Sequence, residues 1–135
     1  FYSEKEKIIF TGDTLFSLGC GRVFEGTYSQ MLKSLNKIKN LPKDTNIYCG
    51  HEYTKKNLNF CSGIDLNNHF LQEKEMWVNL KITKKEPTVP VTIEEELKTN
   101  IFLRCDVASV KKSLGGENSS ELEIFKKLRD LKDSF

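Results

Sequence analysis

Two residues with metal-binding side chains occupy equivalent positions in this sequence. Asp13 and His51 each follow a short apolar segment and a single glycine. If those segments are strands of an α/β sheet, the residues just beyond their ends are where ligands and reacting groups collect. A carboxylate and an imidazole are both ligands of first-row divalent metals, and together they would suit a two-metal hydrolytic site. The same spacing also fits a turn aspartate that caps a backbone N–H and a surface histidine, so both interpretations stay open.

Other motifs with a recognisable chemistry do not occur. The three glycines of residues 19–26 lack the G-x-G-x-x-G spacing of a dinucleotide-binding loop, and no Gly-Lys-Ser/Thr follows them. The four cysteines form neither a C-x-x-C pair nor a zinc-finger spacing. Because no signal-peptide pattern opens the chain, we expect reduced thiols and a cytoplasmic location. The cysteines are Cys20, Cys49, Cys61 and Cys105.

The composition describes an ordinary folded domain. The chain has 135 residues, of which 38% are hydrophobic and 10% aromatic, too many for a disordered polyelectrolyte. A net charge of +2 gives no electrostatic case for nucleic acid or an anionic membrane as partner. No apolar run approaches the length of a membrane span. Because the sequence opens on Phe1 and reaches its first apolar segment within eight residues, we expect it to be part of a longer protein.

The element pattern changes along the chain from mixed to helical. Residues 8–10 and 46–49 are predicted strands, and the helix between them begins at a capping box formed by Thr27 and Gln30. Helices are expected over residues 54–60, around the stripe Phe70, Leu71, Trp77 and Val78, after the capping boxes Thr92/Glu95 and Ser120/Glu123, and over residues 106–114. The inner face of the last helix is expected to consist of Leu122, Phe125, Leu128 and Leu131.

Six segments along the chain have the form of family motifs: FTGDTLF at 10–16, GCGRVFEG at 19–26, YCGHEY at 48–53, EPTVP at 86–90, NIFLR at 100–104 and RDLKD at 129–133. Together they resemble the glyoxalase II (hydroxyacylglutathione hydrolase) family of the metallo-β-lactamase superfamily. These segments cover nearly the whole chain in the order of the family. TGDT occurs across the superfamily, whereas its combination with GHEYT, EPTVP and the final Arg/Lys pair is specific to glyoxalase II.

The resemblance implies an α/β fold with two parts. Residues 1–51 would be the C-terminal part of the metallohydrolase domain, which is the second half of a metallo-β-lactamase αββα sandwich. Residues 52–135 would be a helical substrate-binding domain. The implied activity is hydrolysis of S-D-lactoylglutathione to glutathione and D-lactate, through attack of a metal-bridging hydroxide on the thioester.

The resemblance also implies the roles of individual residues. Asp13 would bridge two divalent metal ions and His51 would bind one of them, with zinc the first choice and iron or manganese as alternatives. The residues expected to bind the glutathione moiety are Arg22, Phe24, Tyr53, Arg129 and Lys132.

Three departures from the family pattern matter. The family usually has lysine at the position of Arg22, and arginine keeps the charge but changes the geometry. It usually has tyrosine at the position of Phe24, so a hydrogen bond worth about 1 kcal/mol is expected to be lost. The H-x-H-x-D-H motif that supplies most of the metal ligands does not occur here, and the second histidine, His69, is expected on the surface. We therefore expect an incomplete metal site and no activity of this chain alone.

Alternatives remain open at this point. One is a helical module that binds glutathione or a protein without catalysis. Another is a persulfide dioxygenase with a single iron, although that family lacks the helical tail that ends with Arg129 and Lys132. Because residues 1–51 would be only half of a sandwich domain, the chain should expose apolar surface. We therefore expect association with the missing N-terminal half or with a second copy of the chain.

Overall fold

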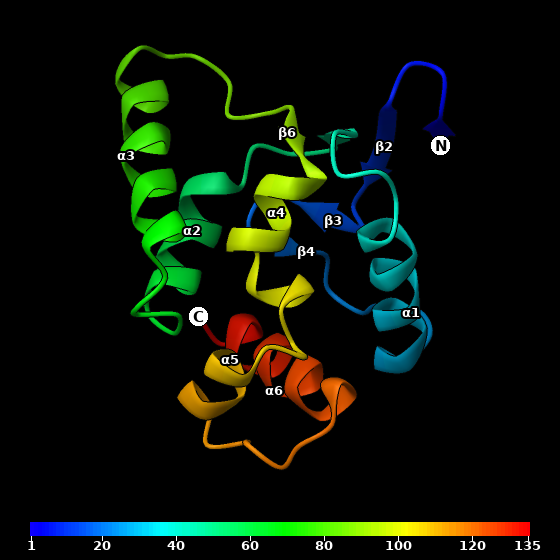
Figure 1. Ribbon diagram of the computed structural model, residues 1–135, viewed down its shortest axis with the longest axis vertical. Coiled ribbons are helices and arrows are strands. Elements are labelled where there is room, and N and C mark those ends of the chain that lie inside the picture. The colour runs from blue at the N-terminus through cyan, green and yellow to red at the C-terminus, as the bar shows by residue number, and fades with distance from the viewer.

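The computed structural model describes residues 1–135, and its centre is a four-stranded mixed sheet (Figure 1). The strand order is β1-β2-β5-β6, in which β2 and β5 are parallel and both outer pairs are antiparallel. The bounds are β1 Tyr2–Ser3, β2 Ile8–Gly12, β5 Asn46–Cys49 and β6 Val91–Thr92. A separate hairpin consists of β3 Leu15–Phe16 and β4 Gly19–Cys20. The two strands predicted at 8–10 and 46–49 are confirmed.

Helix α1, Tyr28–Lys39, connects the two parallel strands and buries Leu32 and Leu35. Its predicted capping box is confirmed, because the Thr27 hydroxyl accepts from the Gln30 N–H and the Gln30 side chain accepts from the Thr27 N–H. Since β2 and β5 run in the same direction, their carboxyl ends meet at one edge of the sheet. The residues that follow these two strands are thereby brought together.

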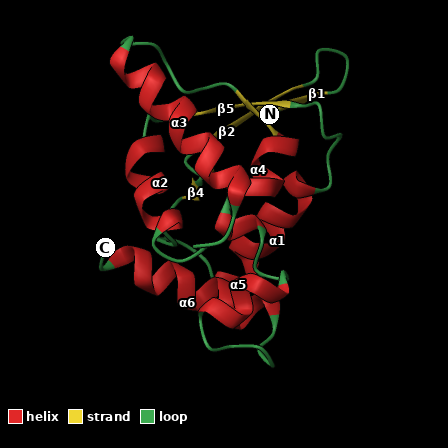
Figure 2. Ribbon diagram, turned by 60° about the vertical axis from the view of Figure 1, so that its left-hand side comes forward, coloured by secondary structure: helices red, strands yellow, loops and turns green.

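Apart from β6, which was not predicted, the chain after β5 is helical, as predicted. The helices are α2 Thr54–Ser62, α3 His69–Thr83, α4 Ile93–Thr99, the 3₁₀ turn Ile101–Leu103, α5 Ala108–Ser113 and α6 Glu121–Asp133. Figure 2 shows the strands β1, β2 and β5 at the top of the molecule with α1, α4, α5 and α6 below them. One cluster of buried apolar side chains runs from Ile9 and Ile47 in the sheet to Phe125 and Leu128 in α6. The sheet and the helices therefore share a continuous core.

Some helical details differ from the sequence expectation. The sequence suggests Thr54 as the cap of the helix expected over 54–60, but Tyr53 occupies the cap position, and the buried Thr54 hydroxyl accepts from the Thr88 hydroxyl at 2.6 Å. The helix expected over 106–114 is shorter, Ala108–Ser113, and follows Val107. In α3, Leu71 and Val78 are buried as expected, but Phe70 is exposed and Lys74 lies on the inner face instead. His69 begins α3 and is exposed, as expected.

The inner face of α6 was predicted incorrectly. Leu122 and Leu131 are 38% and 42% exposed, and the buried residues are Ile124, Phe125, Leu128 and Arg129. Spacings of one, three and one residue describe a single helical stripe, so the helix is rotated relative to the expectation. In this orientation Arg129 reaches the carbonyls of Cys20 and Gly21, while Leu122 and Leu131 face outward.

The sheet leaves aromatic side chains exposed on the face opposite the core. Alternate residues of β2 are buried, whereas Phe10 points outward and is 53% exposed. Its ring lies 6.2 Å from that of Phe1 and 5.6 Å from that of Tyr48 on β5. The expected exposure of apolar surface is thus present; the association inferred from it stays a prediction. None of the helices combines the length and the apolar composition that a membrane-spanning segment requires.

Candidate functional site

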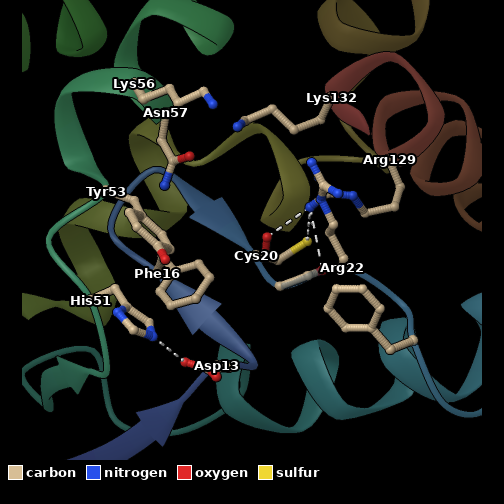
Figure 3. A pocket seen from close by; sticks show the side chains of 12 residues that line it. Asp13, Phe16, Cys20, Arg22, His51, Tyr53, Lys56, Asn57, Arg129 and Lys132 are labelled. Atoms are coloured by element: carbon tan, nitrogen blue, oxygen red, sulfur yellow. Dashed lines mark hydrogen bonds and ion pairs between the residues drawn. The ribbon is translucent and has the colours of Figure 1, made fainter. Parts of the chain in front are cut away.

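All seven residues predicted for the site line one cavity of about 450 Å³ (Figure 3). They are Asp13, Arg22, Phe24, His51, Tyr53, Arg129 and Lys132. Five further residues complete the lining, namely Phe16, Cys20, Gly21, Lys56 and Asn57. The cavity lies between the carboxyl ends of β2 and β5, the β3–β4 hairpin, α2 and α6. It therefore joins the sheet to the helical part of the chain.

The Asp13 and His51 side chains converge at the sheet end of the cavity. Nε2 of His51 lies 3.2 Å from Oδ1 of Asp13. Two ligands that share one tetrahedral zinc ion at 2.0–2.2 Å are roughly 3.3 Å apart, so this pair could bind the same ion. The parallel pairing of β2 with β5 fixes the two positions, and the Gly50 N–H donates to the Gly12 carbonyl at 2.9 Å.

Two glycines approach Asp13 closely, and at Gly21 the contact is with backbone, so glycine is required there. A Cβ on Gly21 would lie 1.9 Å from the Asp13 carbonyl oxygen, and a Cβ on Gly50 would lie 2.9 Å from Asp13 Oδ1. Both distances are shorter than van der Waals contact, so any side chain would displace Asp13 or its neighbour. These glycines let the backbone approach the candidate metal ligand closely.

Asp13 and His51 are the two candidate metal ligands that converge in this chain. No group of three or more His, Cys, Asp or Glu side chains is arranged to hold a metal ion. A catalytic zinc ion takes three protein ligands and a water molecule. Asp13 and His51 have the right chemistry and spacing for part of such a site, and the remaining ligands would have to come from outside residues 1–135.

Two aromatic rings hold the His51 imidazole. The Tyr53 ring stacks on it with a centroid distance of 4.8 Å and an interplanar angle of 10°. The Phe16 ring contacts both at its edge, 6.1 Å from His51 and 5.1 Å from Tyr53. Figure 3 shows these three rings side by side above Asp13. The packing restricts rotation of the imidazole and keeps Nε2 directed at the Asp13 carboxylate.

Arg129 is part of the interior and also part of the cavity wall. It is 3% exposed, and Nη1 donates to the carbonyls of Cys20 at 2.7 Å and Gly21 at 3.3 Å. Nη2 pairs with Asp133 at 3.0 Å, and the guanidinium lies 5.3 Å from the Phe102 ring centre. Arg129 was not among the residues expected on the inner face of α6, and it is buried there because its guanidinium has acceptors in the interior.

Four cationic side chains line the end of the cavity away from Asp13. Besides Arg129 they are Arg22, Lys56 and Lys132. Nε of Arg22 is 3.7 Å from Asp133, and the Lys56 and Lys132 side chains point toward one another in Figure 3. Partial burial lowers the pKa of Lys132, and the neighbouring charges of Arg129, Lys56 and Arg22 lower it further. Cations that repel one another in this way favour an anionic ligand between them. Phe24 forms an exposed apolar rim.

Lys56 was missed in the sequence because the pair Lys55-Lys56 has the form of a solvated helix face. A usable signal was present: Lys56 lies three residues after Tyr53, so both side chains project on one side of the start of α2. Asn57 was missed because its role depends on Ser17, forty positions away, whose carbonyl accepts from Asn57 Nδ2 at 3.1 Å.

The four cysteines are free thiols. Burial raises the pKa of Cys20 to about 11, with Arg129 partly opposing it, and raises the pKa of Cys61 to about 12. Burial also raises the pKa of Cys105. Only Cys49 is partly exposed. Buried, protonated thiols are poor nucleophiles.

We therefore expect iodoacetamide at pH 8 to alkylate Cys49 first. At pH 8 the Cys20 thiol is ionised to about one part in a thousand and the Cys61 thiol to about one part in ten thousand. Because both thiols are also buried, they should react only as fast as the chain unfolds. Peptide mass spectrometry over a time course measures the order. Modification of Cys20 before Cys49 in the folded chain would contradict the burial described here.

Two family models cover the chain. The one described as hydroxyacylglutathione hydrolase C-terminus matches residues 52–135, and the metallo-beta-lactamase superfamily model matches residues 1–51. The hydroxyacylglutathione hydrolase of Pelagibacter ubique (strain HTCC1062) is 54% identical over 135 residues, which are all of this chain and 51% of that relative. The corresponding protein of Bartonella henselae is 47% identical, again over the whole chain and 53% of the relative. The chain thus spans about half the length of the curated relatives it matches, and the predicted fold class is confirmed.

Proposed function

The chain belongs to the hydroxyacylglutathione hydrolase family, and we propose that it supplies one part of an enzyme that hydrolyses 2-hydroxyacyl glutathione thioesters. S-D-lactoylglutathione is the proposed substrate, with glutathione and D-lactate as products. The observation that carries this proposal is the single cavity with a convergent Asp13–His51 pair at one end and four cations at the other. The proposed substrate has a thioester that must be hydrolysed and a glutathione moiety with carboxylates. The Asp13–His51 end of the cavity suits the thioester, and the cationic end suits the carboxylates.

At the first end, Asp13 and His51 are proposed to bind divalent metal together with ligands from the remaining part of the enzyme. Zinc is the first choice, and iron or manganese also suit the pair. Such ions, when bound, polarise a carbonyl and lower the pKa of water. The chain's own contribution is to position both side chains. Gly21 and Gly50 allow backbone to pack closely against Asp13, and the Tyr53 and Phe16 rings pack against the His51 imidazole. A cysteine nucleophile is not required, and the buried Cys20 thiol is unsuited to that role.

At the second end, the cations are proposed to bind the carboxylates of glutathione. Arg22, Lys56 and Lys132 can donate to a ligand in the cavity, whereas Arg129 is already engaged with the Cys20 and Gly21 carbonyls. Arg129 therefore contributes positive charge and a fixed part of the cavity wall, and its guanidinium is not free to bind the ligand. Tyr53 lies between the two ends, beside the imidazole, where it could contact the thioester region.

Lys56 provides a test of this subsite. Replacing Lys56 with alanine should weaken binding of S-methylglutathione by about tenfold. The substitution removes a charge-assisted hydrogen bond worth about 1.5–3 kcal/mol, and the neighbouring Lys132 compensates for part of that loss. Lys55→Ala is the matched control, since Lys55 is adjacent and bonds to Asn79 outside the cavity. Isothermal titration calorimetry measures both. Equal affinities of the two variants would contradict the placement of Lys56 in the subsite.

The proposed partner is the remaining part of the enzyme, which would cover the exposed row of Phe1, Phe10 and Tyr48. The proposed function is tested by adding the part of the Pelagibacter ubique relative that this chain does not span, to give a two-part enzyme. We expect hydrolysis of S-D-lactoylglutathione by the mixture and by neither part alone. A complex that binds glutathione but shows no turnover would instead favour the non-catalytic binding module, and a chain that forms only its own dimer would favour self-association.

A further inference from the structure

The β3–β4 hairpin and its continuation, residues 16–21, make hydrogen bonds to side chains of the helical part in addition to the backbone pairing of β3 with β4. Every backbone carbonyl of this segment accepts a hydrogen bond from a residue at least 40 positions away. Asn100 Nδ2 donates to Phe16 and Gly19, Asn57 Nδ2 to Ser17, Cys61 Sγ to Leu18, and Arg129 Nη1 to Cys20 and Gly21, all at 2.7–3.3 Å.

Glu96 on α4 binds the donors of the same segment. Its carboxylate is fully buried and accepts from the Leu18 N–H at 2.9 Å, the Ser17 hydroxyl at 3.2 Å and Asn100 Nδ2 at 2.8 Å. A buried carboxylate is costly unless it is fully hydrogen-bonded, and these three donors meet that requirement. Glu96 does not line the cavity, so its contribution to the site is made through the hairpin.

The hairpin needs an external restraint. Leu18, at its turn, has φ +61°, in the left-handed region that non-glycine residues rarely adopt. The Glu96 carboxylate binds the backbone N–H of this very residue. The hairpin in turn carries the Phe16 ring against His51 and Tyr53, and Gly21 against the Asp13 backbone.

We propose that Glu96, together with Asn100, is a positioning residue for the site: the Glu96 carboxylate and the Asn100 amide fix residues 16–21 so that Phe16 restrains His51. The helical part thereby does more than bind substrate, because it also orients an imidazole that follows a strand of the sheet. The role is distinct from that of Tyr53, which contacts His51 directly.

The imidazole itself reports on this role. The chain has two histidines, and His51 lies in the ring currents of Phe16 and Tyr53 whereas His69 lies beside Phe70, 4.2 Å between centroids. In Glu96→Gln an NH₂ group replaces one of the two carboxylate oxygens, either Oε1, which accepts from Ser17, or Oε2, which accepts from Leu18 and Asn100. The hydrogen bonds accepted by that oxygen are lost, so we expect the hairpin to shift. We expect the ¹H–¹³C signals of the His51 ring to move and those of His69 to stay. A His69→Gln variant assigns the two signals.

Asp65→Asn is the matched control. Asp65 is also a buried carboxylate; it accepts from Asn68 at 2.9 Å and pairs with Arg104 at 3.4 Å, away from the hairpin. This variant should lower stability without moving the His51 signals. If Glu96→Gln does not fold, Ser17→Ala removes one of the three donors and should move the His51 signals in the same experiment.

A second readout rests on the proposed function, namely the affinity for S-methylglutathione. We expect Glu96→Gln to weaken it by about tenfold and Asp65→Asn by less than about twofold. If the parent chain does not bind this ligand, the proposed function fails for the chain alone while the His51 signals still decide the inference. The inference is overturned if the His51 signals stay in place in Glu96→Gln, or move equally in Asp65→Asn.

Discussion

Replacement of Asp13 with alanine will lower hydrolysis of S-D-lactoylglutathione by the two-part enzyme more than about a hundredfold. Changes in groups that merely orient metal ligands cost 10–100-fold, and Asp13 is proposed as a ligand itself. His51→Ala should have a comparable effect, because its Nε2 lies 3.2 Å from the same carboxylate. The loss should appear in kcat and in bound metal, measured by steady-state kinetics and by inductively coupled plasma mass spectrometry after dialysis.

The control for this substitution is Asp44→Ala. Asp44 is an exposed aspartate that pairs with Lys7, far from the cavity lining. It should leave both metal content and kcat unchanged within about twofold. Full metal content with normal turnover in Asp13→Ala would remove Asp13 from the metal site, whatever the motif around it.

Arg129→Ala is expected to destabilise the chain by about 3 kcal/mol. The substitution leaves the carbonyls of Cys20 and Gly21 and the carboxylate of Asp133 without their donor, and it opens space over Phe102. Loss of one member of a buried charged network costs this order of free energy. Urea unfolding followed by circular dichroism measures the change in the free energy of unfolding.

The comparison for Arg129 is Lys126→Ala, an exposed cation of the same helix. We expect a change below about 0.5 kcal/mol there. A similarly small change in Arg129→Ala would show that the guanidinium is a free ligand-binding group, as the family resemblance implied, rather than part of the interior.

Local features of the fold could be predicted from the sequence because their partners are three or four residues apart. The capping boxes at Thr27 and Thr92 have both of their hydrogen bonds. At Ser120 the hydroxyl accepts from the Glu123 N–H, as expected for the cap. The strands before Asp13 and His51 were equally predictable, because short apolar segments end there at a glycine.

Non-local features could not be predicted in this way. The rotation of α6 depends on Arg129 reaching carbonyls 108 and 109 positions away in the chain. Glu96 stands next to Glu95 of a predicted capping box and has no local signal of its own, since its partners Ser17 and Leu18 are 79 and 78 residues away. The cavity residues expected from the family resemblance do meet, but no periodicity or spacing could have shown which of them would be buried.

An anomalous-diffraction map of the two-part enzyme crystallised with glutathione would locate the metal and the ligand together. We expect a metal peak within about 2.0–2.2 Å of both the Asp13 carboxylate and His51 Nε2, with glutathione carboxylates beside Lys56 and Lys132. A metal ion coordinated without Asp13 and His51, or glutathione bound outside this cavity, would contradict this expectation.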